Sequence, residues 1–214
     1  GLPALRERRR LLPGEDLGYF GDTGRGPYGG RGKDTILRYA RQDVAFLRTF
    51  DLKAVVIACG TVSANALTEL RAENDLPIFG VVEPAARAAV AATRKGKVGL
   101  IATAASVRSG AYEKAIAALD PGVEVRSDAC PLFVPLVEEG RCQPGDVVVE
   151  TVAREYLAPL LAEGIDTLVL GCTHYPLVAE VIGGIAGEDV ALVDVGAEAA
   201  VACRDLLAAG DALT

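Results

Sequence analysis

Two buried, strand-like segments that each end in a cysteine constrain this chain more than any other feature. Ala54-Val-Val-Ile-Ala58 leads into Cys59-Gly60-Thr61, and Thr167-Leu-Val-Leu-Gly171 leads into Cys172-Thr173-His174. In both, a small or polar residue and then a helix-forming segment follow the cysteine. Short apolar strands separated by helical patterns are typical of parallel sheets that helices cover on both faces. Two units of one plan predict two similar α/β lobes facing each other across a cleft.

The remaining segments alternate in the same way, which favours an α/β fold throughout. Strand-like runs cover residues 54–58, 78–82, 98–102, 167–171 and 190–194, and helix-like runs cover residues 63–73, 84–94, 110–119, 147–162, 178–185 and 197–209. We expect residues 1–82 and 190–214 to form the first lobe, with Cys59, and residues 83–189 to form the second, with Cys172. The chain would return to the first lobe near Asp194. In such folds the chemistry collects beyond the carboxyl ends of the strands.

Composition and charge argue against several classes of protein. The formal net charge of −7 would repel a polyanion, so we expect no nucleic-acid partner, and the run Arg8-Arg9-Arg10 is interpreted as a solvated helix end. No apolar run is long enough to span a bilayer, and no signal-peptide core is present. Five scattered cysteines argue against a disulfide framework and for a reducing, cytoplasmic location. With one histidine and no CxxC pair, we expect no metal site.

A cysteine at the end of a strand is well placed for proton transfer. Its thiol has an ordinary pKa of about 8.5, which the amides of a following helix can lower. A thiolate takes a proton and a thiol gives one, so Cys59 and Cys172 on opposite sides of an α-carbon could invert it. No lysine lies in either motif to form a Schiff base. The alternative is that both cysteines are small buried hydrophobic residues. A structural role is the better interpretation of a single strand-end cysteine, but two cysteines in matching contexts favour a catalytic role.

The only histidine, His174, lies two residues after Cys172. A neighbouring imidazole stabilises a thiolate or takes the proton of a thiol, so His174 is a candidate partner of Cys172. The alternative is a hydrogen-bonded histidine at a helix start, which Tyr175-Pro176 also indicates, because proline fits the first helical turn. Both interpretations place His174 at the end of the strand.

Longer motifs resemble the bacterial glutamate racemases of the aspartate/glutamate racemase family. Gly171-Cys-Thr-His-Tyr-Pro176 is similar to the signature around their second catalytic cysteine, and Ala58-Cys-Gly-Thr-Val-Ser-Ala64 to the first. Tyr19-Phe-Gly-Asp-Thr-Gly-Arg-Gly-Pro-Tyr-Gly29 is similar to their substrate loop. Shorter matches follow in family order at Gly80–Pro84, Ile101–Thr103, Ser109–Tyr112 and Leu136–Glu138. Aspartate racemases share the two-cysteine plan but generally lack the His-Tyr-Pro continuation, so they match less well.

The resemblance implies a cofactor-independent isomerase that interconverts L- and D-glutamate and supplies D-glutamate for peptidoglycan. In it, Cys59 would exchange a proton with the D-glutamate face and Cys172 with the L-glutamate face, assisted by His174. Glu138 would lie near His174 or the substrate ammonium. For Glu138 the alternative is a surface carboxylate beside Glu139.

The resemblance also implies a set of substrate contacts. Tyr28 and Gly29 belong to the loop that holds the carboxylate and amino groups of the substrate. Thr61 and Thr173 would donate from hydroxyls or backbone amides beside each cysteine, where helix N-termini favour anions. Thr103 would add another contact. Gly60 would contribute its backbone amide.

Two departures from the family pattern stand out. Family members usually begin with a strand ending in Phe-Asp-Ser-Gly, whereas this chain opens at Gly1-Leu2. We therefore expect a fragment of a longer gene product, in which Cys59 lacks the aspartate thought to assist it. In addition, Gly60 stands where the family usually has asparagine, so that side-chain contact to the substrate is missing.

Three other functions remain open at this level. The chain could racemise aspartate or another amino acid, or it could be an inactive racemase domain that only binds a small acidic ligand. A redox sensor using Cys59 and Cys172 is the third. A homodimer is also open, because many relatives dimerise, although the sequence shows no interface pattern.

Overall fold

The structure is a computed structural model that describes residues 2–209, with side chains from residue 5 onward. Helices and strands alternate along the chain. The order is α1 (Leu2–Leu11), α2 (Lys33–Leu47), β1 (Val55–Val56), α3 (Gly60–Ala72), β2 (Ile78–Phe79), α4 (Val82–Ala92), β3 (Lys97–Ala102), α5 (Ala104–Ser109), α6 (Ala111–Leu119), β4 (Glu124–Ala129), α7 (Phe133–Glu138), α8 (Val147–Ala162), β5 (Thr167–Leu170), the 3-10 helix η1 (Tyr175–Val178), α9 (Ala179–Ala186), β6 (Ala191–Asp194) and α10 (Val195–Ala209). No helix within residues 2–209 is long and apolar enough to cross a membrane.

The strands form two parallel sheets, which confirms the predicted α/β fold. The larger sheet has the order β4-β3-β5-β6, and the smaller consists of β1 and β2. Every pairing is parallel, with Val98 opposite Thr167 and Val55 opposite Ile78. Parallel neighbours need crossover connections, and the helices between the strands supply them.

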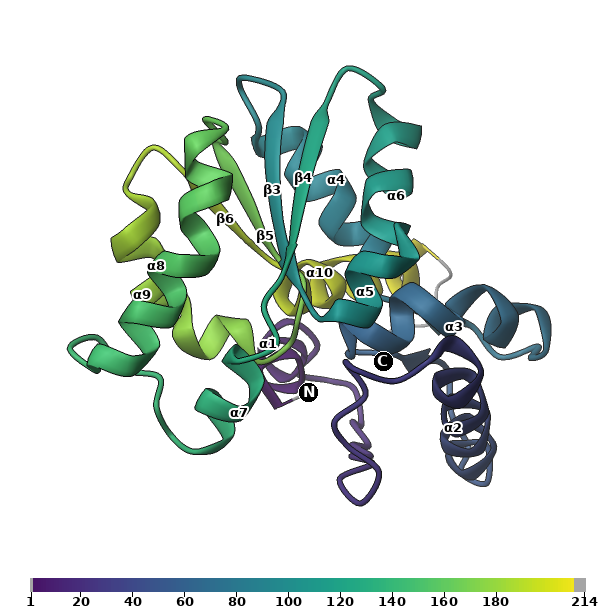
Figure 1. Ribbon diagram of the computed structural model, residues 1–214. Coiled ribbons are helices and arrows are strands. Elements are labelled where there is room, and N and C mark those ends of the chain that lie inside the picture. The colour runs from purple at the N-terminus through teal and green to yellow at the C-terminus, as the bar shows by residue number, and fades with distance from the viewer. Residues whose placement is uncertain (1, 210–214) are drawn as a thin grey trace.

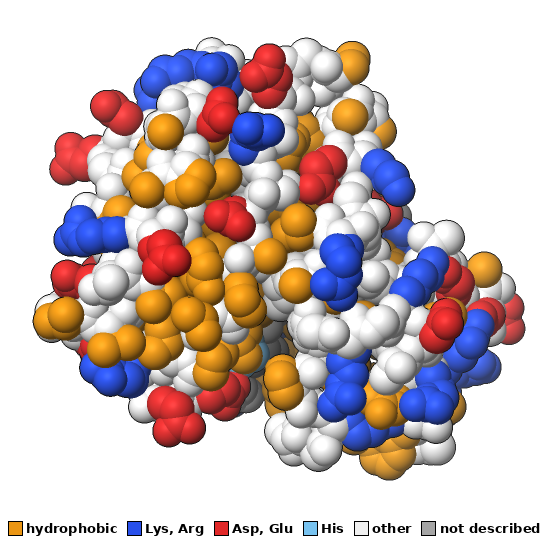
Figure 2. Space-filling view, viewed as in Figure 1, with side chains coloured by type: hydrophobic (Ala, Val, Ile, Leu, Met, Phe, Trp, Pro, Cys, Tyr) orange, Lys and Arg blue, Asp and Glu red, His pale blue; other side chains and the backbone are white. Residues whose placement is uncertain are grey.

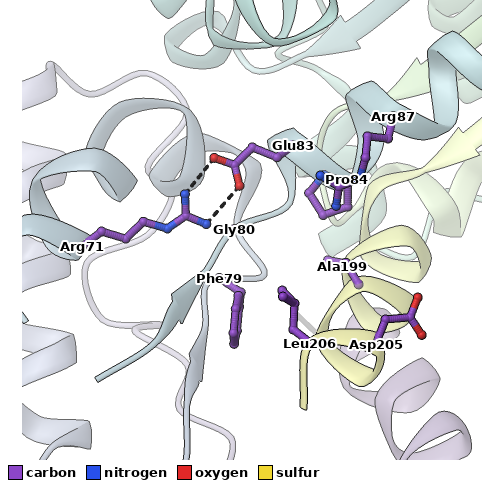
Figure 3. Close-up of a pocket in the computed structure, with 10 residues that line it drawn as sticks. Arg71, Phe79, Gly80, Glu83, Pro84, Arg87, Ala199, Asp205 and Leu206 are labelled. Carbon is purple, nitrogen blue, oxygen red and sulfur yellow. Dashed lines mark hydrogen bonds and ion pairs between the residues drawn. The ribbon is translucent and has the colours of Figure 1, made fainter. Parts of the chain in front are cut away.

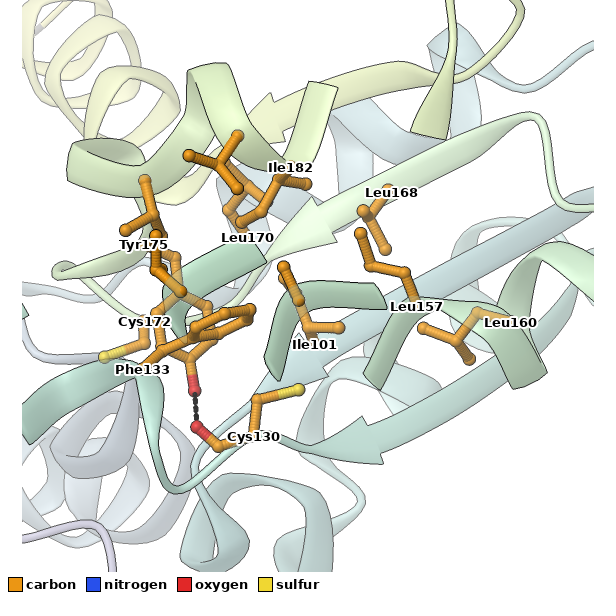
Figure 4. Packing of buried hydrophobic residues seen from close by; sticks show 14 of the residues in the cluster. Ile101, Cys130, Phe133, Leu157, Leu160, Leu168, Leu170, Cys172, Tyr175 and Ile182 are labelled. Atoms are coloured by element: carbon orange, nitrogen blue, oxygen red, sulfur yellow. Dashed lines mark hydrogen bonds between the residues drawn. The ribbon is translucent and has the colours of Figure 1, made fainter. Parts of the chain in front are cut away.

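The larger sheet is the middle of three layers (Figure 1). Because successive side chains of a strand point to opposite faces, its apolar residues divide between two cores. Ile101 and Leu168 pack with α7, α8 and α9 in one core, which Figure 4 shows from close by. Leu100 and Val169 pack with α4 and α6 in the other. The continuous apolar runs of β3 and β5 follow from this double burial.

The smaller sheet has a core of its own. Helices α2 and α3 cover β1 and β2, burying Ile36, Val55, Leu70 and Ile78. The chain reaches this region again at its C-terminal end, where α10 packs against α1. Figure 2 shows the two parts of the molecule with a crevice between them.

The boundaries of several elements differ from the predictions. The runs at 54–58 and 78–82 pair only at Val55–Val56 and Ile78–Phe79, and helix α4 already begins at Val82. Strand β6 pairs with β5. Residues 191–194 therefore belong to the sheet whose strand β5 leads to Cys172, whereas the predicted lobes placed residues 190–214 with Cys59. The division at residue 82 stays a prediction.

The basic run near the N-terminus does end a helix, since Arg8, Arg9 and Arg10 occupy the last turn of α1. The expectation that this end is solvated is wrong for Arg8. Two of its side-chain nitrogens are buried, and burial lowers the pKa of its guanidinium.

Candidate active site

Cys59 lies at the junction of β1 and α3. Its backbone is extended, and its carbonyl oxygen accepts a hydrogen bond from the N–H of Ser63 at 2.9 Å, so Cys59 is the N-cap of the helix. The side chain makes no capping bond and is partly exposed. The side chain packs against the core of the smaller sheet, and its sulfur is not used to cap the helix.

Cys172 follows β5 and Gly171, and only 7% of it is exposed. Burial raises the pKa of its thiol to about 12; the backbone N–H of His174 acts in the opposite direction, and negative charge on Cys59 raises the pKa further. The two sulfurs thus interact electrostatically. With this pKa, Cys172 is a thiol at neutral pH and can give a proton.

Cys172, His174 and Glu138 form a chain of contacts. The sulfur of Cys172 lies 3.7 Å from Nδ1 of His174, and Nε2 of His174 lies 2.6 Å from a carboxylate oxygen of Glu138. A carboxylate only accepts hydrogen bonds, so Nε2 carries a proton and donates it. Nδ1 of the neutral imidazole is then an acceptor that faces the thiol. This arrangement lets His174 take the proton of Cys172 while Glu138 holds the ring.

Glu138→Gln should lower kcat about two- to fivefold, because the neutral amide no longer stabilises a protonated His174. The effect is modest since 66% of the Glu138 side chain is exposed to solvent. The matched control is Glu139→Gln, at the adjacent exposed position that caps α7. Initial rates of glutamate inversion measure both variants. Equal loss in the two would show that surface charge matters and not the contact with His174.

Two of the predicted substrate-binding threonines contact each other. The hydroxyl oxygens of Thr61 on α3 and Thr103 at the start of α5 are 2.8 Å apart. Thr103 also contacts the hydroxyl of Ser106 at 2.9 Å. Thr173 is buried next to Cys172. The hydroxyls of Thr61, Thr103 and Ser106 therefore form one buried polar cluster that joins the starts of α3 and α5.

The loop of residues 19–31 contacts the start of α5. The carbonyl oxygen of Gly29 accepts a hydrogen bond from the N–H of Ala105 at 2.9 Å. A Cβ atom at Gly29 would lie 2.9 Å from the Cβ of Thr103. A larger residue would therefore push the loop away from Thr103, so the close approach of the loop depends on glycine.

A network of charges holds the same loop against α2. Arg25 pairs with Asp22 at 2.7 Å and with Asp43 at 2.5 Å. The hydroxyl of Tyr28 donates to Asp22 and lies 3.4 Å from Asp43. Burial raises the pKa of Asp43, and the charge of Asp22 raises it further, although Arg25 opposes both. The Tyr28 hydroxyl is thus used within the loop in this conformation.

Asp43→Asn should raise the KM for glutamate about three- to tenfold and leave kcat nearly unchanged, because it weakens a charge-assisted bond that orders the loop. Asp51→Asn is the control, since Asp51 is exposed just beyond the end of α2. Steady-state kinetics of both variants test this. A fall in kcat at unchanged KM would contradict a role in ordering the loop.

Several residues of this region were not assigned a role from sequence. Tyr112 is fully buried, and its hydroxyl donates a hydrogen bond to the carbonyl of Gly171 at 3.4 Å. The side-chain amide of Asn65 donates to the carbonyl of Thr61 at 2.9 Å and to that of Ala105 at 3.3 Å. Tyr112 lies in one of the short family-like motifs, which was the available signal. Nothing in the sequence distinguished Asn65 or Asp43 from other polar helical residues.

Another hollow of about 380 Å³ lies between the end of β2, α4 and α10. Phe79 and Leu206 face it, and Arg71 bonds Glu83 at its rim (Figure 3). Neither cysteine lines this hollow, so it is separate from the site described above. Within residues 2–209, no three histidine, cysteine or acidic side chains gather as metal ligands would.

Comparison with known proteins agrees with this geometry. Residues 25–203 match the model of the Asp/Glu/Hydantoin racemase family. The chain is 49% identical over 213 residues to a glutamate racemase of Geobacter metallireducens, covering 100% of this chain and 78% of the relative. The fold matches glutamate racemase isoform RacE1 of Bacillus anthracis with a TM-score of 0.94 at 38% identity, covering 100% of this chain and 79% of that one. It also matches the Francisella tularensis glutamate racemase in complex with D-glutamate, with a TM-score of 0.91 at 37% identity and 99% and 78% coverage. The family match over residues 25–203, together with 49% identity to a glutamate racemase along the whole chain, places this protein in the Asp/Glu/Hydantoin racemase family.

Proposed function

We propose that this protein is a glutamate racemase that interconverts L- and D-glutamate with two thiols and no cofactor. The observation that carries the proposal is the pairing of Cys59 and Cys172: they follow strands of different sheets, and their neighbours Gly60 and Gly171 lie in direct backbone contact. The relatives named above, two of them solved structures, are glutamate racemases. The proposed product role is the supply of D-glutamate for peptidoglycan in the cytoplasm, where free cysteines such as these stay reduced.

In the proposed reaction, one cysteine removes the α-proton of glutamate and the other gives a proton to the opposite face of the α-carbon. Starting from D-glutamate, the thiolate of Cys59 removes the α-proton, and the electron pair is left on the α-carbon and its carboxylate. The thiol of Cys172 then gives its proton to the opposite face, which leaves L-glutamate, a Cys59 thiol and a Cys172 thiolate. The reverse direction uses that Cys172 thiolate as base. Between turnovers, His174 and Glu138 are placed to exchange the Cys172 proton with water.

Threonine hydroxyls and the glycine-containing loop are proposed to hold the substrate. Thr61 and Thr103 are buried and their hydroxyls contact each other, and Thr173 is buried next to Cys172 in the chain, so these three would supply polar groups to the substrate. Tyr28 and Gly29 lie in the loop that docks on α5. The carboxylates of the substrate would be held by hydroxyls and by backbone amides at helix starts such as that of α3.

Polarimetry or circular dichroism of L- or D-glutamate incubated with the protein tests the proposal. We expect loss of optical activity toward the racemic mixture from either enantiomer, with solvent deuterium entering the α-position. Inversion of aspartate but not glutamate would identify the protein as an aspartate racemase. No inversion of either would favour a domain that only binds a small acidic ligand.

A further inference from the structure

The backbones of the two cysteine motifs touch directly. Gly60, the first residue of α3, follows Cys59, and Gly171 precedes Cys172. A Cβ atom at Gly60 would overlap the carbonyl oxygen of Gly171. Because that neighbour is backbone at the end of a central strand, it cannot swing aside as a flexible side chain would. In this chain, which has glycine where the family usually has asparagine, the contact between the two motifs therefore depends on a residue without a side chain.

Tyr112 meets the same carbonyl from inside the second lobe. Its ring is fully buried among α4, α6 and the larger sheet, and its hydroxyl donates to the Gly171 carbonyl at 3.4 Å. A Cβ atom at Gly60 would lie 3.3 Å from that hydroxyl. Burial raises the pKa of Tyr112, as does negative charge on Cys172 and Cys59, so the hydroxyl stays protonated and remains a donor.

We propose that Gly60 is a positioning residue that sets the separation of the Cys59 and Cys172 sulfurs through its backbone contact with Gly171. This inference rests on the proposed racemase function. Each cysteine is one peptide bond from the contact, so a change of spacing there passes directly to both thiols. Gly60 thus acts through the cysteines, and the hydroxyl of Tyr112 holds the Gly171 carbonyl in place.

Gly60→Ala tests the proposal by its effect on kcat and KM. The added methyl group must separate the motifs by on the order of 1 Å, which lowers kcat about 10- to 100-fold with a smaller change in KM. Gly184→Ala on α9 is the control, because an added Cβ there meets nothing within 4 Å. A kcat within about twofold of the parent in Gly60→Ala would overturn the proposal. So would a raised KM with unchanged kcat, which would make Gly60 a substrate contact.

Thiol alkylation tests the same contact without substrate. Cys172 is buried beside the contact, so opening the lobes should speed its reaction with iodoacetamide in Gly60→Ala but not in Gly184→Ala. Cys130, fully buried in the core of the second lobe, is the internal reference. Peptide mass spectrometry measures each rate. An unchanged Cys172 rate in folded Gly60→Ala would overturn the proposal.

These readouts separate the positioning proposal from the proposed function. An inactive parent protein refutes the racemase function, whereas the alkylation rates still report the contact at Gly171. If Gly60→Ala does not fold, Tyr112→Phe replaces it, because that variant removes only the hydroxyl on the other side of the same carbonyl. Faster alkylation of Cys172 in Tyr112→Phe would support the proposal, and an unchanged rate would overturn it.

Discussion

Cys59→Ser and Cys172→Ser should each lower the rate of glutamate inversion by about a thousandfold or more, because a serine hydroxyl ionises far less readily than a thiol and loses the acid–base contribution of that residue. Serine is close to cysteine in size, so the fold should be retained. Cooperative urea unfolding and far-ultraviolet circular dichroism verify the fold, and polarimetry measures inversion in both directions.

The two variants should differ in hydrogen exchange. In Cys59→Ser, Cys172 with its partner His174 can still remove and return the α-proton of L-glutamate, so deuterium should enter L-glutamate without inversion. In Cys172→Ser, the same exchange should occur with D-glutamate through Cys59. Mass spectrometry of separated enantiomers reads this directly.

Cys130→Ser is the control for cysteine loss at a position away from the crevice. Cys130 is buried, and its backbone carbonyl accepts a bond from the Tyr175 hydroxyl at 2.9 Å, which serine preserves (Figure 4). Cys130→Ser should change the stability of the fold and not which enantiomer of glutamate takes up deuterium. Inversion at the parent rate in Cys59→Ser or Cys172→Ser would exclude the two-thiol mechanism.

Phe133→Ala should lower the free energy of unfolding by about 3–5 kcal/mol, the range for a large aromatic residue removed from a core. Phe133 is fully buried, and its ring packs edge-on against Tyr156 at 5.3 Å and Tyr175 at 5.2 Å between centroids. It is also the first residue of α7, the helix that ends at Glu138. The cavity left behind should therefore loosen the contact of Glu138 with His174 as well as the core.

Urea unfolding measures the stability of Phe133→Ala, and Leu132→Ala is the matched control. Leu132 is the adjacent residue, and it is 50% exposed. Its backbone N–H, which bonds the Tyr156 hydroxyl at 3.3 Å, is kept in the variant. We expect a loss within about 1 kcal/mol for Leu132→Ala. Similar losses in both variants would mean that α7 is not anchored by the Phe133 ring.

Sequence reasoning was sufficient for features that depend on local pattern. Long apolar strands such as β3 and β5 were predictable because they are buried on both faces and read as continuous apolar runs. Strand β4 was missed because its sequence, Glu-Val-Arg-Ser-Asp-Ala, has three consecutive polar residues and no apolar run, which suits its partial burial at the edge of the sheet. Helix α2 was also missed, although its buried residues Ile36, Ala40 and Val44 follow a helical spacing.

The candidate site likewise has features that local sequence predicted and features that only the tertiary structure revealed. The two strand-end cysteines, and the histidine that follows Cys172, are local features, so the sequence alone already suggested thiol chemistry. Contacts between residues distant in sequence needed the tertiary structure. Glu138 and His174 are 36 residues apart, and only the packing of α7 against η1 brings the carboxylate to the imidazole. The raised pKa of Cys172 likewise comes from burial under surrounding elements, which no local motif specifies. The contact of Gly60 with Gly171 depends on how two separate sheets meet, so local sequence pattern alone could not reveal why that position lacks a side chain.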